Sequence, residues 1–172
     1  GLRGLKILVQ DIQNPGKEIL AMALWGGRFN KKMDQYVRHF NDSFPFDRRL
    51  FAADIAGSIA YSSALVDVGI LSEEEFEKLH DGLEKIRLEF EEGVFTTHPE
   101  DEDIHTSVER RLGEIVGEVA GKIHTGRSRN DQVTTDLRLY LLAEISILGE
   151  MVVEFQKALI DLAENNLDLI MP

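Results

Sequence analysis

The feature that most constrains the fold is a set of apolar residues near the C-terminal end of the chain. The set, called the apolar seam below, comprises Leu141, Ile145, Leu148, Val152, Phe155, Leu159 and Leu162. The residues are four or three positions apart in alternation, which is the heptad spacing of a helix that packs along another helix. A helix from about residue 131 to 169 would be roughly 55 Å long at 1.5 Å per residue. That length is too great for one compact domain, so the seam predicts a helical bundle shared between subunits.

A polar segment with two arginines precedes this helix. Residues 121–132 read GKIHTGRSRNDQ, in which Ser128 and Asp131 have the spacing of a capping box. Backbone N–H groups at a helix start lack partners within the helix, and an arginine can hold a carboxylate or phosphate with two hydrogen bonds. Arg127 and Arg129, behind a flexible Gly126, therefore predict an anion site. From spacing alone, a solvated helix cap with surface arginines is the commoner arrangement, so both interpretations stay open.

Three shorter helices are predicted upstream, at residues 48–68, 72–92 and 103–119. The first is rich in Ala, Gly and Ser, which allows other helices to approach closely, and Asp47 is a candidate cap for it. The second opens with a capping box at Ser72 and Glu75. It carries a single apolar stripe at Phe76, Leu79, Leu83, Ile86 and Phe90.

The acidic run at residues 101–103 lies close to His105. Such a cluster can suggest a metal site, but consecutive acids are also favoured at a helix start by the helix dipole. We expect the second role and predict no metal.

Composition narrows the possible partners. The net charge is −12, from 31 acidic and 19 basic residues, which argues against nucleic acid or an anionic membrane as a partner. The absence of cysteine excludes disulfides and thiol chemistry and fits a cytoplasmic protein. No apolar run approaches the roughly 20 residues that span a bilayer.

Residues 124–132, HTGRSRNDQ, resemble the signature segment of the argininosuccinate lyases, which belong to the fumarase/aspartase superfamily. Four other stretches resemble that family in the expected order: residues 25–29 (WGGRF), 40–48 (FNDSFPFDR), 101–106 (DEDIHT) and 109–112 (ERRL). The resemblance extends over roughly residues 22–172.

This resemblance implies an all-α fold, in which a small N-terminal helical domain precedes the first long helix of a central helical bundle. We expect a mobile leader or extension at residues 1–21, with a functional arm as the alternative. The N-terminal helical domain would cover residues 22–120, and the signature segment and long helix would cover residues 121–172. In the family, four subunits share the bundle, and three of them build each active site.

The resemblance also implies an anti elimination that converts argininosuccinate to arginine and fumarate, without a cofactor. Because the carbanion intermediate spreads charge into a carboxylate, the site needs fixed positive charge and N–H donors. The family's substrate-binding positions correspond to Ser43, Asn130, Arg129, Ser128 and Arg127. Asp103 and His105 are expected close to the active site, with a helix-capping cluster as the alternative.

In the family, a Thr-His pair follows shortly after the position of Pro172, and a mobile loop with a catalytic serine and a lysine comes much further on. We therefore expect an N-terminal fragment that is inactive alone and contains no catalytic residue, with His124 in a structural role. One alternative is a non-catalytic structural protein of the same fold, like the delta-crystallins. Another is a different fumarate-releasing lyase, such as an adenylosuccinate or aspartate enzyme. The residues alone, without the resemblance, indicate only a helical interaction module.

Overall fold

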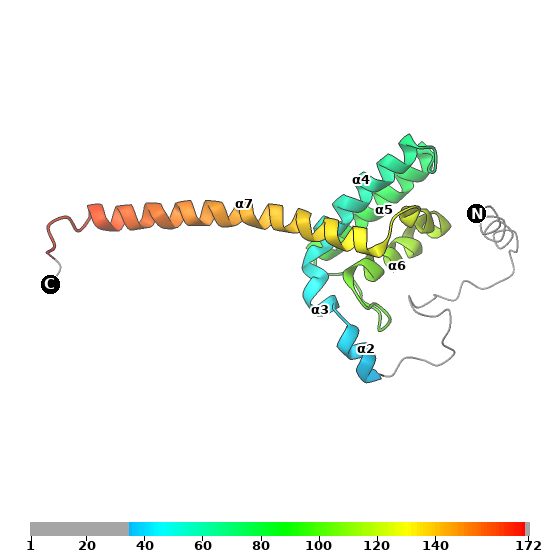
Figure 1. Ribbon diagram of the computed structural model, residues 1–172, viewed down its shortest axis with the longest axis horizontal. Coiled ribbons are helices and arrows are strands. Elements are labelled where there is room, and N and C mark those ends of the chain that lie inside the picture. The colour runs from blue at the N-terminus through cyan, green and yellow to red at the C-terminus, as the bar shows by residue number, and fades with distance from the viewer. Residues whose placement is uncertain (1–34, 171–172) are drawn as a thin grey trace, which may run out of the picture. The chain divides into compact units, whose positions relative to one another are not determined.

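The computed structural model describes residues 35–170 (Figure 1). By its internal contacts the chain divides into two units, Gly1–Val37 and Arg38–Pro172. Every regular element among the described residues is helical: α2 (Gln35–Asn41), α3 (Phe44–Asp47), η1 (Arg48–Leu50), α4 (Phe51–Asp67), α5 (Glu73–Glu91), α6 (Ile104–Val116), η2 (Gly117–His124) and α7 (Arg129–Glu164). The predicted all-α fold is confirmed for this range. The expected leader at residues 1–21 and the family-like opening at residues 25–29 lie outside it.

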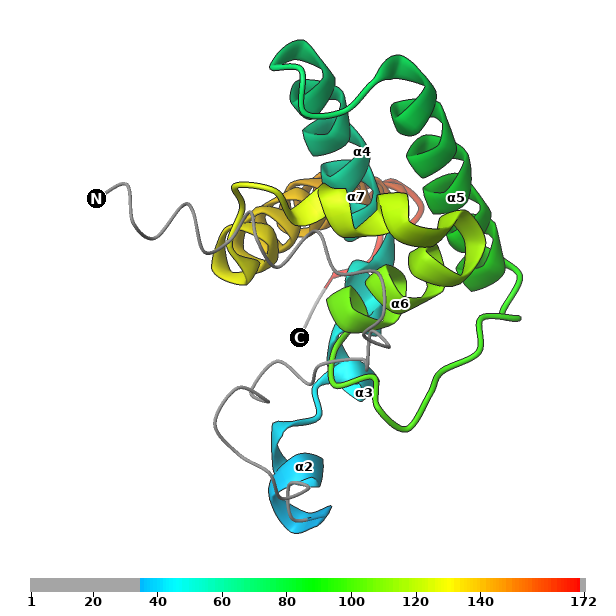
Figure 2. The same cartoon turned by 90° about the vertical axis from the view of Figure 1, so that its right-hand side faces the viewer.

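Helices α4 and α5 run side by side, and α6 packs against both (Figure 2). The apolar stripe predicted for α5 is confirmed, because Leu79, Leu83 and Ile86 are fully buried against the core residues of α4 and α6. The predicted capping box also forms. The Ser72 hydroxyl accepts a hydrogen bond from the Glu75 N–H, and the Glu75 carboxylate accepts one from the Ser72 N–H.

The small residues of α4 allow close packing, as the sequence predicted. Helix α4 contacts α5, α6 and α7. A Cβ atom added to Gly57 would lie 3.0 Å from Oδ1 of Asp136 on α7, so this position leaves little room for a side chain. Helix α4 therefore lies between the other helices and links the start of α7 to the core.

Two predicted helix boundaries differ from the structure for local reasons. Helix α6 ends at Val116 rather than at residue 119, because Gly117 adopts a φ of 74° and the chain continues as the 3₁₀ helix η2. Helix α7 ends at Glu164 rather than at residue 169. Just beyond it, the side-chain amides of Asn165 and Asn166 donate to carbonyl groups of the last turn, which is a common way for a helix to stop.

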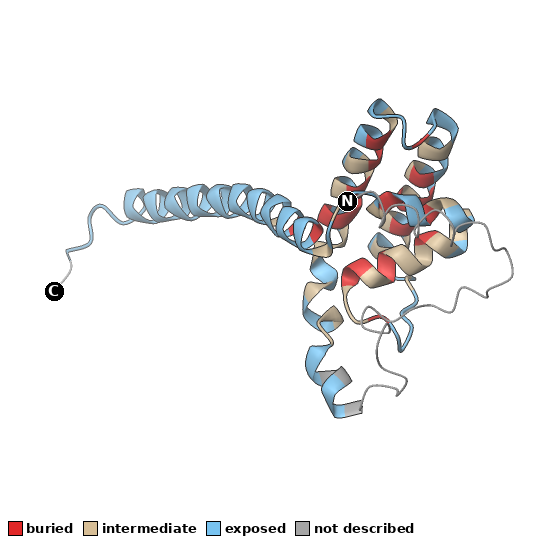
Figure 3. Cartoon of the chain, turned by 45° about the vertical axis from the view of Figure 1, so that its right-hand side comes forward, coloured by how far each residue is buried: buried red, intermediate tan, exposed pale blue. Residues whose placement is uncertain are grey.

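Helix α7 is anchored only at its beginning. Gln132 and Asp136 are buried, whereas every residue from Leu141 to Ile170 is exposed (Figure 3). The apolar seam is therefore uncovered by the described part of the chain. Among the described residues, no helix is both long enough and apolar enough to cross a membrane.

Candidate functional site

The signature segment begins with a tight turn. The Arg127 N–H donates to the His124 carbonyl at 3.1 Å, which closes a four-residue turn. Thr125 has φ −59° and ψ 115°, and Gly126 has a φ of 77°. These angles are those of a type II turn, which requires a positive φ at its third residue and therefore favours glycine there. Gly126 thus allows the positive φ that the turn before α7 requires.

Arg127 is held at this turn by an aromatic ring. Its guanidinium carbon lies 4.7 Å from the centroid of the Tyr61 ring on α4, within the range of a cation–π contact. Its Nε and Nη2 atoms are buried and have no hydrogen-bond partner among the described residues. A buried donor without an acceptor costs about 1–3 kcal/mol, so this edge of Arg127 would be stabilised by an incoming acceptor.

In two other arginines, the Nε and Nη2 atoms donate hydrogen bonds to a carboxylate. Arg110 donates from Nε and Nη2 to the two carboxylate oxygens of Asp101, at 2.8 and 2.9 Å. Arg111 donates from the same pair of atoms to Glu89, at 2.8 and 2.6 Å. The corresponding edge of Arg127 is thus chemically suited to one carboxylate.

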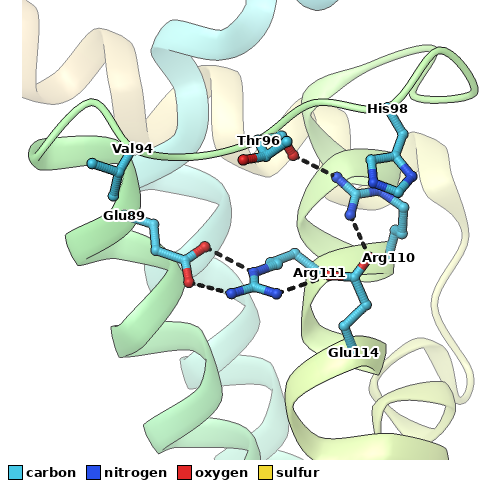
Figure 4. A pocket seen from close by; sticks show the side chains of 7 residues that line it. All are labelled: Glu89, Val94, Thr96, His98, Arg110, Arg111 and Glu114. Atoms are coloured by element: carbon cyan, nitrogen blue, oxygen red, sulfur yellow. Dashed lines mark hydrogen bonds and ion pairs between the residues drawn. The ribbon is translucent and has the colours of Figure 1, made fainter.

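These two paired arginines line a hollow between α5 and α6 (Figure 4), whose other lining residues include Val94, Thr96 and Glu114. The Nη1 atoms of Arg110 and Arg111 both donate to Glu114, and Arg110 also donates to the Thr96 carbonyl. Because the protein's own groups occupy these donors, the hollow is an internal ion-pair network and a poor candidate for an anion site.

Ser128 begins α7, as the sequence predicted. Its hydroxyl accepts from the Asp131 N–H at 3.2 Å, and the Asp131 carboxylate accepts from the Ser128 N–H at 3.0 Å. Arg129, in the first turn, donates to Gln132 and to Glu109, each at 3.4 Å. Asn130 follows and is exposed. The structure thus brings residues 127–130 together at one helix start, where Asn130 is an exposed residue.

Glu109 of α6, the first residue of the family-like stretch 109–112, connects the signature segment to the core. It accepts from Arg129, and it lies 3.0 Å from Nε2 of His124. Burial opposes ionisation of Glu109, but the hydrogen bond from His124 and the nearby positive charges outweigh it and lower the pKa of Glu109. His124 is therefore within hydrogen-bonding distance of a side chain of the core helix α6.

Ser43 lies in a different cluster. Its hydroxyl donates to Asp47 at 2.6 Å, and its N–H donates to the Glu102 carbonyl at 2.9 Å. Asp47 was expected to cap the helix that follows it, but its side chain instead accepts from the Ile104 N–H at the start of α6. Within residues 35–170 no hydrogen bond joins Ser43 to the signature segment. Burial raises the pKa of Asp47, although the Ser43 hydrogen bond opposes the rise.

The acidic run before α6 separates into different roles. Asp101 pairs with Arg110, whereas Asp103 is the N-cap of α6 and accepts from the Thr106 N–H at 2.6 Å. His105 points into the core and is 3% exposed. The two residues expected close to the active site, Asp103 and His105, therefore serve as a helix cap and as a buried polar group.

His105 belongs to a buried cluster that joins three helices. Its Nδ1 atom lies 3.1 Å from Oδ1 of Asp54 on α4 and 3.2 Å from Oδ2 of Asp136 on α7. Gln132, one turn before Asp136, donates its side-chain amide to Asp54. This buried cluster of four polar side chains fixes the start of α7 against α4 and α6. His105 and Gln132 lie in stretches that the sequence pattern marked, whereas Asp54 and Asp136 do not, although Asp54, an acid in an apolar helix, was a usable signal.

The charges in the buried cluster are set by its geometry. Burial alone would lower the pKa of His105, but hydrogen bonds from its ring to Asp136 and Asp54 raise it to about 9, so the ring is positively charged at neutral pH. Burial raises the pKa of Asp136 to about 6. The carboxyl of Asp54 is also buried, yet its bonds to His105 keep its pKa below the usual value. An imidazolium therefore compensates the ionised Asp54.

The same three groups, Asp54, His105 and Asp136, place one ligand atom each within 4.8 Å of one another, a set of the kind that Zn²⁺ can use. However, a protonated His105 would place its positive charge between the two carboxylates, with Nδ1 hydrogen-bonded to Asp54 and 3.2 Å from Asp136, and Gln132 supplies a further donor. His105 and Gln132 both bond to Oδ1 of Asp54, whereas Oδ2 of Asp54 and Oδ2 of Asp136 are buried without a hydrogen-bond partner among the described residues. Hydrogen bonds within the protein therefore account for part of the cluster, and we assign no metal to it.

The chain matches a family of known proteins. A family model described as "Lyase" matches residues 27–172. Because this match covers most of the chain, the chain belongs to that lyase family.

The curated relatives are more specific. A probable argininosuccinate lyase of Schizosaccharomyces pombe is 52% identical over 150 residues, which are 87% of this chain and 33% of that protein. The argininosuccinate lyase of Roseiflexus sp. is 52% identical over 149 residues, with the same coverage of 87% and 33%. That of Chlamydomonas reinhardtii is 48% identical over 149 residues, covering 87% and 32%. These matches confirm the resemblance seen in the sequence, and the chain spans about a third of the length of the curated relatives it matches.

Proposed function

We propose that this chain forms the part of an argininosuccinate lyase that binds a substrate carboxylate. The reaction would eliminate fumarate from argininosuccinate and leave arginine, as in arginine biosynthesis. The observation that carries the proposal is the unpaired Nε and Nη2 edge of Arg127, in the turn before α7. The relatives named argininosuccinate lyase support the choice of substrate.

The proposed chemistry requires positive charge where negative charge develops. Removal of a proton beside a carboxylate leaves a carbanion that spreads charge into that group, and fixed N–H donors stabilise it. Arg127 and Arg129 supply charge and donors. Asn130 is exposed and its amide is open to a ligand. Ser128 keeps the helix start in place through the capping box, and Ser43 would contact the substrate from its separate cluster.

Proton transfer is assigned to groups other than the two histidines near this site. His105 is buried and positively charged at neutral pH, so it lacks the free nitrogen that a general base needs. His124 is paired with Glu109. We therefore assign no catalytic residue within residues 35–170, and we expect the isolated chain to be inactive.

We further propose that α7 assembles with α7 helices of other subunits into a homotetramer. The exposure of the apolar seam supports an assembly of this kind, since water-exposed leucines and a phenylalanine at heptad spacing suit a helix partner. In this arrangement residues 22–120 would form the N-terminal domain, and residues 121–172 would begin the central bundle. A cytoplasmic location stays a prediction from composition.

The test is fumarate release from argininosuccinate, followed by ultraviolet absorbance, with the full-length protein and with this chain alone. Arg127→Lys keeps the positive charge and removes the Nε–H edge. Because a charge-assisted hydrogen bond contributes about 1.5–3 kcal/mol, we expect KM to rise about tenfold to a hundredfold. Arg87→Lys is the matched control, since Arg87 forms only surface ion pairs on α5.

Absence of fumarate release by the full-length protein would contradict the proposed reaction. Release with an unchanged KM in Arg127→Lys would contradict the assignment of Arg127 and leave the reaction itself standing. Release by the isolated chain would show that proton-transfer groups lie within it, against our expectation.

A further inference from the structure

The four-residue turn of the signature segment, His124 to Arg127, could adopt either a type II or a type I conformation. Rotation of the peptide between Thr125 and Gly126 would convert it to type I, in which the third residue has a negative φ. Gly126 can adopt either sign of φ at little cost. The hydrogen bond from the Arg127 N–H to the His124 carbonyl is compatible with both types, so a further contact is needed to select one of them.

Tyr61 makes that contact. Its phenolic hydroxyl donates to the Thr125 carbonyl at 2.7 Å, and this carbonyl belongs to the peptide that would rotate. In a type I turn the same carbonyl would point elsewhere and the hydrogen bond would be lost. The Tyr61 hydroxyl therefore favours the type II conformation, with its positive φ at Gly126.

The ring of the same tyrosine supports Arg127. The guanidinium carbon lies 4.7 Å from the ring centroid, so the hydroxyl of this one side chain contacts the central peptide of the turn and its ring contacts the last residue. Tyr61 extends from α4, whose neighbouring residue Ser62 is buried and bonded to the Ser58 carbonyl. The support thus comes from a helix fixed in the core and not from the turn itself.

We propose that Tyr61 is a positioning residue for substrate binding, which holds the turn in its type II form and keeps Arg127 in place for a carboxylate. The proposal rests on the proposed function for the role of Arg127. Tyr61 would act through the turn and the guanidinium, without touching the substrate. No part of this role was visible in the sequence, because Tyr61 and Thr125 are 64 positions apart.

Two substitutions separate the two contacts. Tyr61→Phe removes the hydroxyl and keeps the ring under Arg127, whereas Tyr61→Leu removes both. Tyr140→Phe is the matched control, because it removes from α7 a hydroxyl that forms no hydrogen bond within residues 35–170.

The first measurement is the rate of trypsin cleavage after Arg127 and Arg129 in the folded protein, which needs no substrate. Cleavage of a folded chain follows the population of locally open states. We expect Tyr61→Phe to increase the rate about fivefold, the effect of one neutral hydrogen bond. Tyr61→Leu should increase it by a further factor of about five through loss of the cation–π contact. Tyr140→Phe should have no effect. A wild-type rate in Tyr61→Leu would overturn the proposal.

The second measurement is the steady-state kinetics of fumarate release by the full-length protein. Loss of a positioned binding group should raise KM with little change in kcat, most in Tyr61→Leu and less in Tyr61→Phe. Simple destabilisation of the fold would lower kcat through loss of active protein and leave KM unchanged. That second pattern, or a changed cleavage rate with unchanged kinetics, would overturn the positioning role. If the wild-type protein releases no fumarate, the proposed function fails, while the trypsin measurement still tests the contact of Tyr61 with the turn.

Discussion

Stability should depend on pH through one histidine. His105 is 3% exposed and lies between the carboxylates of Asp54 and Asp136, which hold its ring in the charged form. The perturbation that tests this interaction is His105→Gln, which replaces the titrating ring by a neutral amide. The variant leaves two buried carboxylates without their counter-charge, so we expect it to be less stable than the wild type at neutral pH.

The magnitude follows from the pKa of His105, which rises from 6.5 to about 9 on folding. A group with a raised pKa stabilises the folded state fully below its unfolded pKa and loses that effect as pH rises to the folded pKa. A rise of this size corresponds to about 3 kcal/mol. The pKa of Asp136 is about 6 and that of Asp54 is lowered, so both carboxyls titrate below this window. Between pH 6.5 and 9, the change in the buried cluster therefore comes from His105.

The assay is urea unfolding followed by circular dichroism at several pH values across that window. The unfolding free energy of the wild type should fall by about 3 kcal/mol from the low to the high end, whereas that of His105→Gln should stay nearly constant. His80→Gln, which removes a half-exposed histidine of α5, should keep the wild-type slope. If His105→Gln does not fold, Asp136→Asn removes one of the two carboxylates and should make the slope smaller. An equal slope in the wild type and His105→Gln would refute the charged state assigned to His105.

Three further predictions test packing, assembly and binding. Gly82→Ala would place a Cβ atom 2.7 Å from a methyl group of Val116 and should destabilise the fold by about 1–3 kcal/mol in thermal unfolding, whereas Gly113→Ala, with open space around it, should not. Phe155→Glu should reduce the molecular mass measured by light scattering to that of a smaller assembly. It should not lower the stability of the core, because Phe155 is 64% exposed in the single chain. An unchanged mass would count against assembly through α7. Argininosuccinate should raise the melting temperature of the full-length protein, and Asn130→Ala should reduce that shift; an undiminished shift would exclude Asn130 as a ligand contact.

Local patterns predicted the local structure well. The stripe and capping box of α5 depend on residues three or four positions apart, and those interactions form within one helix. The capping box of Ser128 and Asp131 likewise predicted the start of α7 to within two residues. The end of α7 was less accurate, because the apolar pattern continues to Leu169 while Asn165 and Asn166 already terminate the helix.

The contacts that shape the site could not be predicted in the same way, because they join residues far apart in the sequence. The hydrogen bond between Asp54 and His105 spans 51 positions, and that between Asp54 and Gln132 spans 78. No periodicity relates such residues. Asp47 illustrates the error that follows, since its neighbours suggested a cap for the next helix and the fold uses it to cap α6 instead. A sequence can signal an unusual residue, such as an acid in an apolar helix, but not its partner.

The anchoring of α7 couples the two roles proposed for it. An isolated helix of this length in water depends on packing for its stability, and beyond its first turns α7 has none within the described chain. Gln132 and Asp136 are its only buried residues, and both belong to the cluster around His105. The same two turns follow directly from Arg127 and the type II turn. A change that loosens the buried cluster should therefore disturb both the carboxylate-binding segment and the direction in which the apolar seam meets other subunits. We expect Asp136→Asn to weaken substrate binding and assembly together, because Asp136 lies between the carboxylate-binding segment and the apolar seam. Phe155 lies within the seam itself, so Phe155→Glu should affect assembly first.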